Sequence, residues 1–219
     1  MNLKNNSMRI AGIFLGLSVL CAAAAVAAER ISLFDGKTLK GWTVLKCEAE
    51  VDNGEILIKA GNGLVQSEQK YGDFVLEFDW KNLKQDKYDS GIYFRYDETM
   101  MTGKAPWPPR YQCNLRKGDE GNVTGVKGAK PGTDLVKPGE WNHFKLTVKG
   151  AKSGKDLVKP GDWNQFKLTV KGEKAELEIN GKPAWKGEGL EGPKEGFIAL
   201  QAEVPGGGQF RFRNTYLTK

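Results

Sequence analysis

Apolar side chains recur at every second position between Gly72 and Tyr96, with polar side chains in most of the gaps. This alternation is typical of β-strands that have one apolar and one polar face. A charged turn divides the stretch, so the pattern predicts two strands. Their predicted apolar faces consist of Phe74, Leu76, Phe78 and Trp80 on the first strand and Ile92, Phe94 and Tyr96 on the second.

The polar faces of these two strands are a candidate ligand site. If the strands pair side by side with their apolar faces in one layer, Glu77 and Asp79 lie next to Tyr93 and Arg95. Two carboxylates about 7 Å apart on one strand, with an arginine on its neighbour, can bind a small polar ligand. Spacing alone favours the alternative, a solvated sheet face on which each charge pair contributes little stability.

Short alternating runs continue after Arg30, separated by Gly, Asp, Asn and Pro turns, and no segment there keeps a helical period. The chain has 28 glycines, and Asn180-Gly181 is a strong hairpin signal. These features predict an all-β sandwich or barrel. Further residues expected in its core are Leu146, Leu168, Leu177, Phe210 and Phe212.

A tandem repeat interrupts this pattern, because Ala129–Gly150 is followed directly by the nearly identical Ala151–Gly172. The copies differ only at Pro131/Ser153, Thr133/Lys155, Glu140/Asp162 and His143/Gln165. Two copies are too few for a solenoid, so a duplicated turn-plus-strand unit explains the repeat better. The second copy runs into the next hairpin and is expected to be integral. The first is expected to form an added edge strand or a protruding hairpin.

The N-terminus has the organisation of a secretory signal peptide. Lys4 and Arg9 precede an apolar run, Ile10 to Val26, that ends in small residues, so cleavage is expected near Ala28. A retained membrane anchor is the alternative. We therefore expect residues 1–28 to be a signal peptide, and residues 29–219 to form one β-sandwich domain that is secreted or periplasmic.

Charge argues against a nucleic acid partner. The net charge is +6, and removal of the two basic residues of the leader lowers it to +4. The remaining charges are interleaved in sign, without a basic block. No later apolar stretch is long enough to span a bilayer, so we expect no membrane contact after signal cleavage. Cys47 and Cys113 could form a disulfide or remain two free thiols.

Two further regions carry candidate binding residues. Trp107 lies between prolines in a loop, where it could stack on a sugar ring or plug one end of the sandwich. The strand from Arg110 to Leu115 places Gln112 and Asn114 on its polar face. His143, the single histidine, is a candidate general base. Gln165 at its twin position and its lysine neighbours argue against that role.

Ordered motifs carry a resemblance to a known family. They are LFDGKTLKGW, DNGEILI, YGDFVLEFDW, DSGIYFR, KPGEWNHF with KPGDWNQF, ING, GFIALQAE and FRFRN. Together they resemble the 3-keto-disaccharide hydrolase family, also described as a 3-keto-glucoside lyase and hydratase domain, over nearly all of the mature chain. The resemblance implies an all-β, concanavalin A-like jelly-roll sandwich of two antiparallel sheets, and oligosaccharide or glycoside substrates.

The implied chemistry starts from a sugar whose C3 hydroxyl has been oxidised to a ketone. The ketone acidifies the C2 proton, so a base can remove it while an oxyanion stabiliser holds the enolate and the C1 glycosidic oxygen leaves. Water then adds back, which gives net hydrolysis without the paired carboxylates of an ordinary glycosidase. The resemblance also allows a divalent metal at the enolate, although no metal motif is present.

The resemblance and the strand alternation together assign roles to the candidate residues. Asp79 is expected to be the base or a metal ligand, because burial can raise the pKa of a carboxyl group. Arg95 is expected to hold a sugar oxygen or the enolate through its fixed donor fork. The expected substrate-binding residues are Glu77, Tyr93, Trp107, Gln112 and Asn114, with Glu77 also a substitute for Asp79.

The chain departs from the family pattern in three places. Arg110-Tyr111-Gln112 stands where Glu-x-Gln is usual, Asp89-Ser90-Gly91 stands where Asn-Ser-Gly is usual, and the GEWN unit is doubled. The first departure replaces a carboxylate by a cation, which weakens any role of a glutamate there as base or metal ligand. A non-catalytic, lectin-like carbohydrate-binding module therefore stays as the alternative function.

Overall fold

A computed structural model describes residues 29–131, 139–140, 142–147, 165–179 and 182–219. The expected signal peptide lies outside the described residues. The described chain is almost entirely β-structure, with one 3-10 turn η1 (Glu98–Met100) and one short helix α1 (Val204–Gly207). Its strands are β1 (Arg30–Ser32), β2 (Trp42–Asp52), β3 (Glu55–Ser67), β4 (Phe74–Asn82), β5 (Gly91–Tyr96), β6 (Gln112–Asn114), β7 (Val123–Thr124), β8 (Asn142–Thr147), β9 (Gln165–Lys171), β10 (Lys174–Ile179), β11 (Lys182–Glu188), β12 (Phe197–Glu203) and β13 (Phe210–Thr218).

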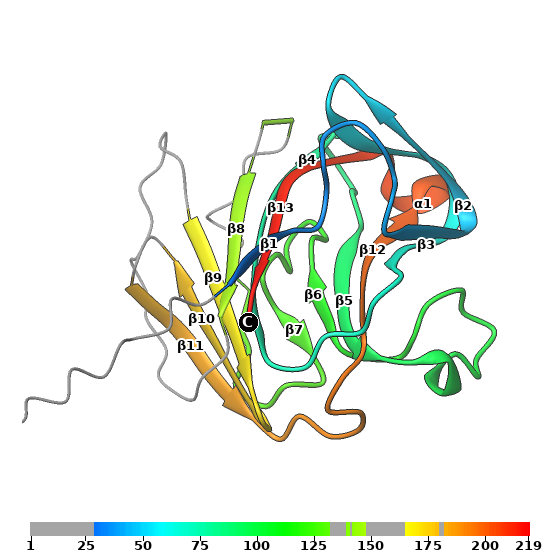
Figure 1. Cartoon of the computed structure of the whole chain (residues 1–219). Helices are drawn as coiled ribbons and strands as arrows, with labels where there is room; N and C mark the ends of the chain where they lie inside the picture. Colours follow the sequence, from blue (N-terminus) through cyan, green and yellow to red (C-terminus); the bar gives the residue numbers. More distant parts are fainter. Residues whose placement is uncertain (1–28, 132–138, 141, 148–164, 180–181) are drawn as a thin grey trace, which may run out of the picture.

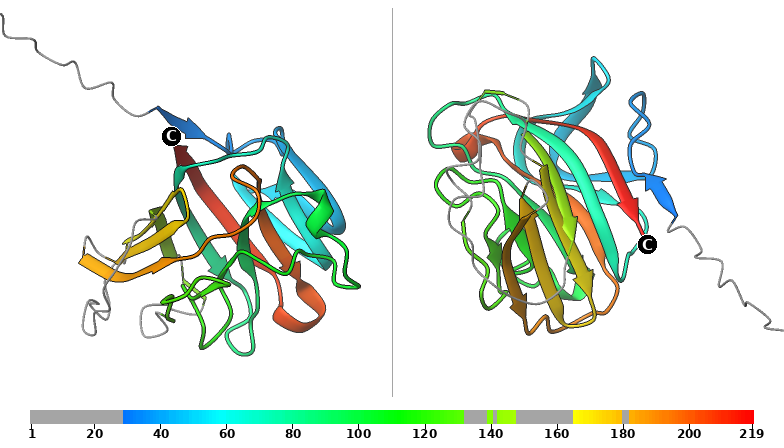
Figure 2. Two further views of the ribbon diagram at one scale, coloured as in Figure 1. Left: turned by 90° about the horizontal axis from the view of Figure 1, so that it is seen from below. Right: turned by 90° about the vertical axis from the view of Figure 1, so that its left-hand side faces the viewer.

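The strands form one curled sheet in the order β11-β10-β9-β8-β4-β13-β3-β12-β5-β6-β7, with β1 beside β13 and β2 beside β3. The curl brings its two ends into two layers (Figures 1 and 2). The predicted all-β, antiparallel jelly-roll class is confirmed. The two layers belong to one continuous sheet, and the described pairing of β8 with β9 is parallel.

The predicted apolar faces form the core between the layers. The buried residues include Phe74, Leu76, Phe78, Trp80, Ile92, Phe94, Leu177, Phe210 and Phe212, as predicted. The rings of Trp80 and Phe210 stack with centroids 5.7 Å apart. The side chains of Leu146 and Leu168 lie outside the described part of the structure. Cys47 and Cys113 are free thiols, and burial raises the pKa of Cys113 to about 12.

The expectation that β4 and β5 pair side by side is wrong. β4 pairs with β13, β8 and β9, whereas β5 pairs with β12 and β6. The two strands instead face each other across the core, where the rings of Phe74 and Phe94 meet edge to face at 6.1 Å. The connecting segment therefore crosses between layers. It is tied to the turn before β13 by bonds from Leu83 N to Gln209 O and from Asp89 N to Gly207 O.

The two copies of the repeat share the same edge of β4. β9, from the second copy, pairs Val170 with Phe74 and Leu168 with Leu76. Continued by two residues, this register would place Phe166 opposite Phe78. That place is taken by Phe144 of β8, the equivalent residue of the first copy. The described strand of the first copy, β8, therefore lies between β4 and β9, and the expectation that this strand lies at an edge or protrudes is wrong.

Because both copies fit one register on β4, deletion of either Ala129–Gly150 or Ala151–Gly172 should leave a folded protein. The two products differ in sequence only at the four positions at which the copies differ. Both are expected to unfold in one cooperative transition, measured by circular dichroism during chemical denaturation. Deletion of both copies, which removes β8 and β9, is the control and should prevent folding. Loss of cooperative unfolding in either single deletion would contradict the shared register.

Phe78→Ala should lower the free energy of unfolding by about 3–5 kcal/mol, because the ring is 1% exposed and its removal leaves a cavity. Leu83→Ala is the matched control, since Leu83 is 42% exposed and should change stability by less than about 0.5 kcal/mol. Urea denaturation of both variants measures the difference. Equal effects of the two substitutions would show that the core assignment of β4 is wrong.

Candidate active site

The outer face of β4 carries Glu77 and Asp79, and both are engaged in ion pairs. Asp79 Oδ2 accepts hydrogen bonds from Arg213 Nε at 3.2 Å and from Asn214 Nδ2 at 2.7 Å. Glu77 Oε2 accepts from Arg30 Nε at 3.3 Å. These contacts join β4 to β13 and β1 on the outside of the sandwich.

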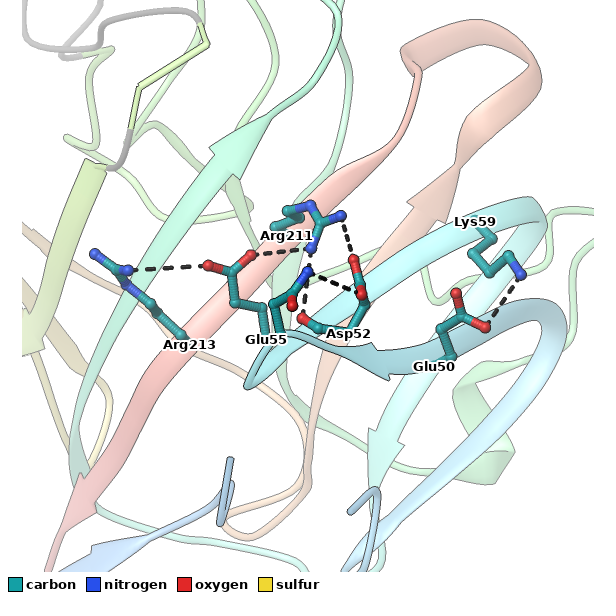
Figure 3. Close-up of polar contacts among 7 residues, drawn as sticks. Glu50, Asp52, Glu55, Lys59, Arg211 and Arg213 are labelled. Carbon is teal, nitrogen blue, oxygen red and sulfur yellow. Dashed lines mark hydrogen bonds and ion pairs between the residues drawn. The ribbon is translucent and has the colours of Figure 1, made fainter. Parts of the chain in front are cut away.

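A wider network of charges continues across the same outer face. Arg211 donates to Asp52 Oδ2 at 2.6 Å and to Glu55 Oε2 at 3.0 Å, and Arg213 lies 3.9 Å from Glu55 Oε1 (Figure 3). Alternating acid and base side chains on neighbouring strands are the usual surface pattern of a stable antiparallel sheet. The charge pairing that spacing favoured therefore describes this side of the molecule, although Glu77 and Asp79 are buried rather than solvated.

Arg95 lies at neither outer face. A bulge in the pairing of β5 with β12 gives Arg95 a φ of 50° and places the side chain at one end of the sandwich. Its guanidinium donates to the carbonyl of Gly172 and, at 2.6 Å, to Asp73 Oδ1, and it is 4% exposed. Burial lowers the pKa of Arg95, and the charge of Asp73 opposes that effect. In this position Arg95 clamps β5 to the segments that flank β4 and β10.

The predicted site is therefore divided. Glu77 and Asp79 point away from the core on one layer, whereas Tyr93 and Gln112 point away from it on the other. The structure brings Tyr93, Gln112 and Asn114 together on the outer face of β5 and β6. It does not bring Asp79 or Arg95 to them, because β4 and β5 lie in opposite layers.

A chain of side-chain hydrogen bonds runs across the outer face of β6, β5 and β12. Tyr93 Oη donates to Gln112 Oε1 at 3.2 Å, and Gln112 Nε2 donates to Gln201 Oε1 at 2.6 Å. Gln201 Nε2 then donates to Glu203 Oε2 at 2.9 Å. Each amide accepts on one side and donates on the other, so the chain fixes the orientation of all four side chains. We call these four residues the polar relay.

The absence of a side chain at Gly91 leaves space for the polar relay. It lies on β5 opposite Asn114 of β6, with Tyr93 two residues further along the same face. A Cβ on Gly91 would collide with the side-chain amide of Gln112. Gln112 can therefore cross over β5 to reach Gln201 only because residue 91 has no side chain.

Two carboxyl groups, Asp89 and Glu203, lie at one end of the polar relay. Burial raises the pKa of Asp89 to about 6, with a further contribution from the negative charge of Glu203 and an opposing one from Arg116. Burial also raises the pKa of Glu203. The pKa of Tyr93 is raised by burial and by these two carboxylates, so its hydroxyl keeps its proton at neutral pH. The site therefore combines a carboxylate that titrates near neutrality with a protonated phenol.

The backbone of Asp89 is held by α1. Gly207 accepts a hydrogen bond from Asp89 N at 3.2 Å, and a Cβ on Gly207 would overlap the backbone of Asp89. Pro205 lies in the first turn of the helix, where its fixed φ is tolerated. Because Glu203 immediately precedes the helix, α1 fixes the two carboxyl-bearing residues relative to each other.

The loop between β6 and β7 borders the same end of the site. Asp119 Oδ2 accepts from Asn114 Nδ2 at 2.8 Å and from Arg116 at 3.1 Å. Glu120, which is 1% exposed, accepts a short hydrogen bond from the hydroxyl of Tyr88. These contacts hold the charge of Arg116 near Asp89. Asn114 thus supports the loop, and its expected role in substrate binding stays a prediction.

The opposite end of the face is apolar. Tyr93, Tyr96 and Phe197 belong to a second buried cluster, separate from the main core. Trp107 is half-buried and packs against this cluster, together with partly buried Leu45, Met100 and Met101. The loop tryptophan therefore anchors its loop on the sheet, and it keeps part of its surface exposed beside the site.

Two other candidates are the imidazole of His143 and a divalent-metal site. The side chain of His143 lies outside the described residues. Within the described ranges there is no group of three or more His, Cys, Asp or Glu side chains that could hold a metal ion. Asp89 and Glu203 alone do not make up a divalent-metal site of the usual ligand number.

Sequence patterns contained part of the signal for this site. Gln201 and Glu203 interrupt the apolar strand GFIALQAE at period two, which places them on one face. Asp89 is the acidic residue of the departure from Asn-Ser-Gly. Neither feature shows that β12 lies beside β5. The polar relay forms only because these two strands are neighbours.

Comparison with protein families agrees with the fold and the polar face. Residues 29–218 match the model of the 3-keto-alpha-glucoside-1,2-lyase-like domain. The chain belongs to this family. Family membership associates the chain with carbohydrate chemistry of a hydrolase-like kind and with a sugar ligand. A comparison with curated proteins finds no match.

Solved structures show the same fold at low identity. Two candidate glycosyl hydrolases from Parabacteroides distasonis ATCC 8503 are similar to this chain. The first is 18% identical with a TM-score of 0.61, covering 86% of this chain and 98% of that one. The second is 20% identical with a TM-score of 0.56, covering 86% of this chain and 93% of that one.

In the described part of this chain no helix is long and apolar enough to cross a membrane.

The raised pKa of Asp89 predicts a pH dependence of stability. Between the ordinary pKa near 3.8 and about 6, the folded state holds a proton that the unfolded state has released. The free energy of unfolding therefore falls as the pH rises through this window. Asp89→Asn should reduce this fall, to which Glu203 also contributes, and gain about 1 kcal/mol over the parent at pH 7.5 but not at pH 3.5, after discounting for partial exposure.

Denaturation with urea at several pH values measures the effect. Glu48→Gln, which changes an exposed carboxylate on β2, is the matched control and should keep the slope of the parent. A parent-like slope in Asp89→Asn would show that the Asp89 carboxyl group is solvated rather than buried.

Proposed function

We propose that this protein cleaves 3-keto-glycosides by elimination and rehydration at the outer face of β5, β6 and β12. The observation that carries the proposal is that a carboxyl group of pKa about 6, Asp89, lies near enough to the phenol of Tyr93 for its charge to help raise the pKa of that phenol. One can accept a proton near neutral pH, and the other can donate a hydrogen bond to an oxyanion. These are the two functions that enolisation beside a ketone requires.

In the proposed reaction Asp89 removes the C2 proton of the sugar. The electron pair moves toward C3, and the hydroxyl of Tyr93 turns from Gln112 Oε1 to donate its hydrogen bond to the enolate oxygen that forms. The enolate then re-forms the ketone and expels the C1 oxygen, which takes a proton from solvent. Water adds to the resulting unsaturated sugar and Asp89 returns its proton, so that the net result is hydrolysis.

The remaining residues of the face orient the reacting groups. Gln112 and Gln201 fix the hydroxyl of Tyr93 and present amide groups to sugar hydroxyls. Glu203 keeps a second negative charge near Asp89, which helps to raise the pKa of Asp89. Arg116 opposes that effect, so its distance from Asp89 tunes the pH at which the base becomes active.

The second candidate function is sugar binding without cleavage. The observation that favours it is Arg110, which stands where the family pattern has a glutamate and which pairs with Glu191 at 3.3 Å. If cleavage requires a carboxylate at position 110, this chain has lost cleavage. The polar relay would still bind sugar hydroxyls. Release of the aglycone from a 3-keto-glucoside distinguishes the two functions.

Asp89→Asn should lower kcat/KM for 3-keto-glucoside cleavage by at least about 100-fold, because it removes the base. In the parent, log kcat/KM should rise with pH and level off above about 6, where Asp89 is ionised. Tyr93→Phe should cost about 10–100-fold with the same pH profile. Circular dichroism confirms that each variant is folded.

Asp79→Asn is the informative comparison, since Asp79 lies on the opposite outer surface and was expected, from the family resemblance and strand alternation together, to be the base or a metal ligand. Activity close to that of the parent in Asp79→Asn and its loss in Asp89→Asn would support the proposed site. Loss of activity in Asp79→Asn and parent-like activity in Asp89→Asn would show that the site lies on β4 instead. Glycan binding without cleavage in the parent would favour the binding module.

A further inference from the structure

The outer face of β12 changes character along its length. Glu203 and Gln201 lie at one end, and Ala199 and Phe197 continue the same face toward the other. At about 3.3 Å per residue, Glu203 and Phe197 are separated by roughly 20 Å along the strand. This distance exceeds the length of one sugar ring. A ligand centred on the carboxyl end therefore extends toward the apolar end if it carries a substituent.

The apolar end is built from half-buried side chains of the loop between β5 and β6, the green loop that carries η1 in Figure 1. Met100, Met101 and Trp107 all pack against the cluster that contains Tyr93 and Tyr96. Tyr93 therefore belongs to both ends, with its ring in the apolar cluster and its hydroxyl in the polar relay.

Several contacts hold this loop against the sheet. Asp97 caps η1 by accepting from Thr99 N at 3.0 Å. Lys70 pairs with Glu98 at 3.2 Å and lies 4.7 Å from the ring centroid of Phe197. The half-exposed side chains are thus presented from a fixed loop, which lowers the entropy cost of binding an apolar group.

We propose that this apolar end binds the leaving group of the substrate, and that the preferred substrates are 3-keto-glycosides of aromatic alcohols. The inference rests on the proposed function of the polar end. The partly exposed indole of Trp107 can pack against an aromatic ring in offset or edge-to-face geometry, whereas the rings of Tyr93 and Tyr96 are buried beneath it. Methionine side chains adapt their shape, so leaving groups of different outline can be accommodated. A phenolate also leaves with less help from a proton donor than an alkoxide does.

The test compares two substrates, phenyl 3-keto-β-glucoside and methyl 3-keto-β-glucoside, which differ only in the leaving group. Trp107→Ala should lower kcat/KM for the phenyl substrate by about 10-fold and for the methyl substrate by less than about 2-fold. Trp107→Phe should restore most of the loss, because it keeps an aromatic ring. Leu83→Ala, an exposed apolar residue on the segment between β4 and β5, is the control and should leave both values unchanged.

The outcomes separate this inference from the proposed function. Equal effects of Trp107→Ala on both substrates, or no effect on either, would overturn the aromatic leaving-group site while cleavage itself persists. Absence of cleavage of both substrates by the parent would overturn the proposed function and the inference with it. If Trp107→Ala fails to fold, Met101→Ala serves as the second variant, with the same expected difference between substrates.

Discussion

The packing of the apolar face of β4 against that of β5 governs the rest of this structure. Each strand presents a row of large apolar side chains, and burial of such rows against each other is the main favourable term in folding. The rings of Phe74, at the start of β4, and Phe94 meet edge to face in this contact. Since side chains alternate along a strand, this contact also sends the two polar rows to opposite surfaces. One surface carries ion pairs that link strands, and the other carries the polar relay.

Local sequence pattern predicted which side chains are buried but could not predict which strands are neighbours. Alternation is a property of each strand alone, so the core residues of β4, β5 and β13 were identified correctly. Strand order depends on contacts far apart in sequence, such as β12 beside β5, about a hundred residues away. Glu77 and Asp79 therefore looked like partners of Tyr93, whereas the real neighbours of Tyr93 include Gln112 and, through it, Gln201.

The candidate site shows how glycine placement can fix chemistry. Gly91 lets the amide of Gln112 cross β5, and Gly207 lets α1 approach the backbone of Asp89. At both glycines a neighbouring segment packs closely against the backbone, and neither glycine has a positive φ. Sequence signals for turns therefore could not identify their role. The carboxyl group of Asp89 and the phenol of Tyr93 are set by backbone packing on both sides. The reacting groups are thereby held in one geometry before a substrate arrives.

The duplicated strand leaves this site undisturbed because it is accommodated in the other layer. β8 and β9 divide the edge of β4 between them, far along the sheet from β5 and β12. The one described link between the repeat and β5 is the bond from Arg95 to the carbonyl of Gly172. Both copies end in the same Thr-Val-Lys-Gly sequence, so Gly150 could supply that carbonyl if the second copy were absent. We therefore expect the clamp between the layers to survive loss of either copy, because the sequence that supplies the carbonyl is present in both.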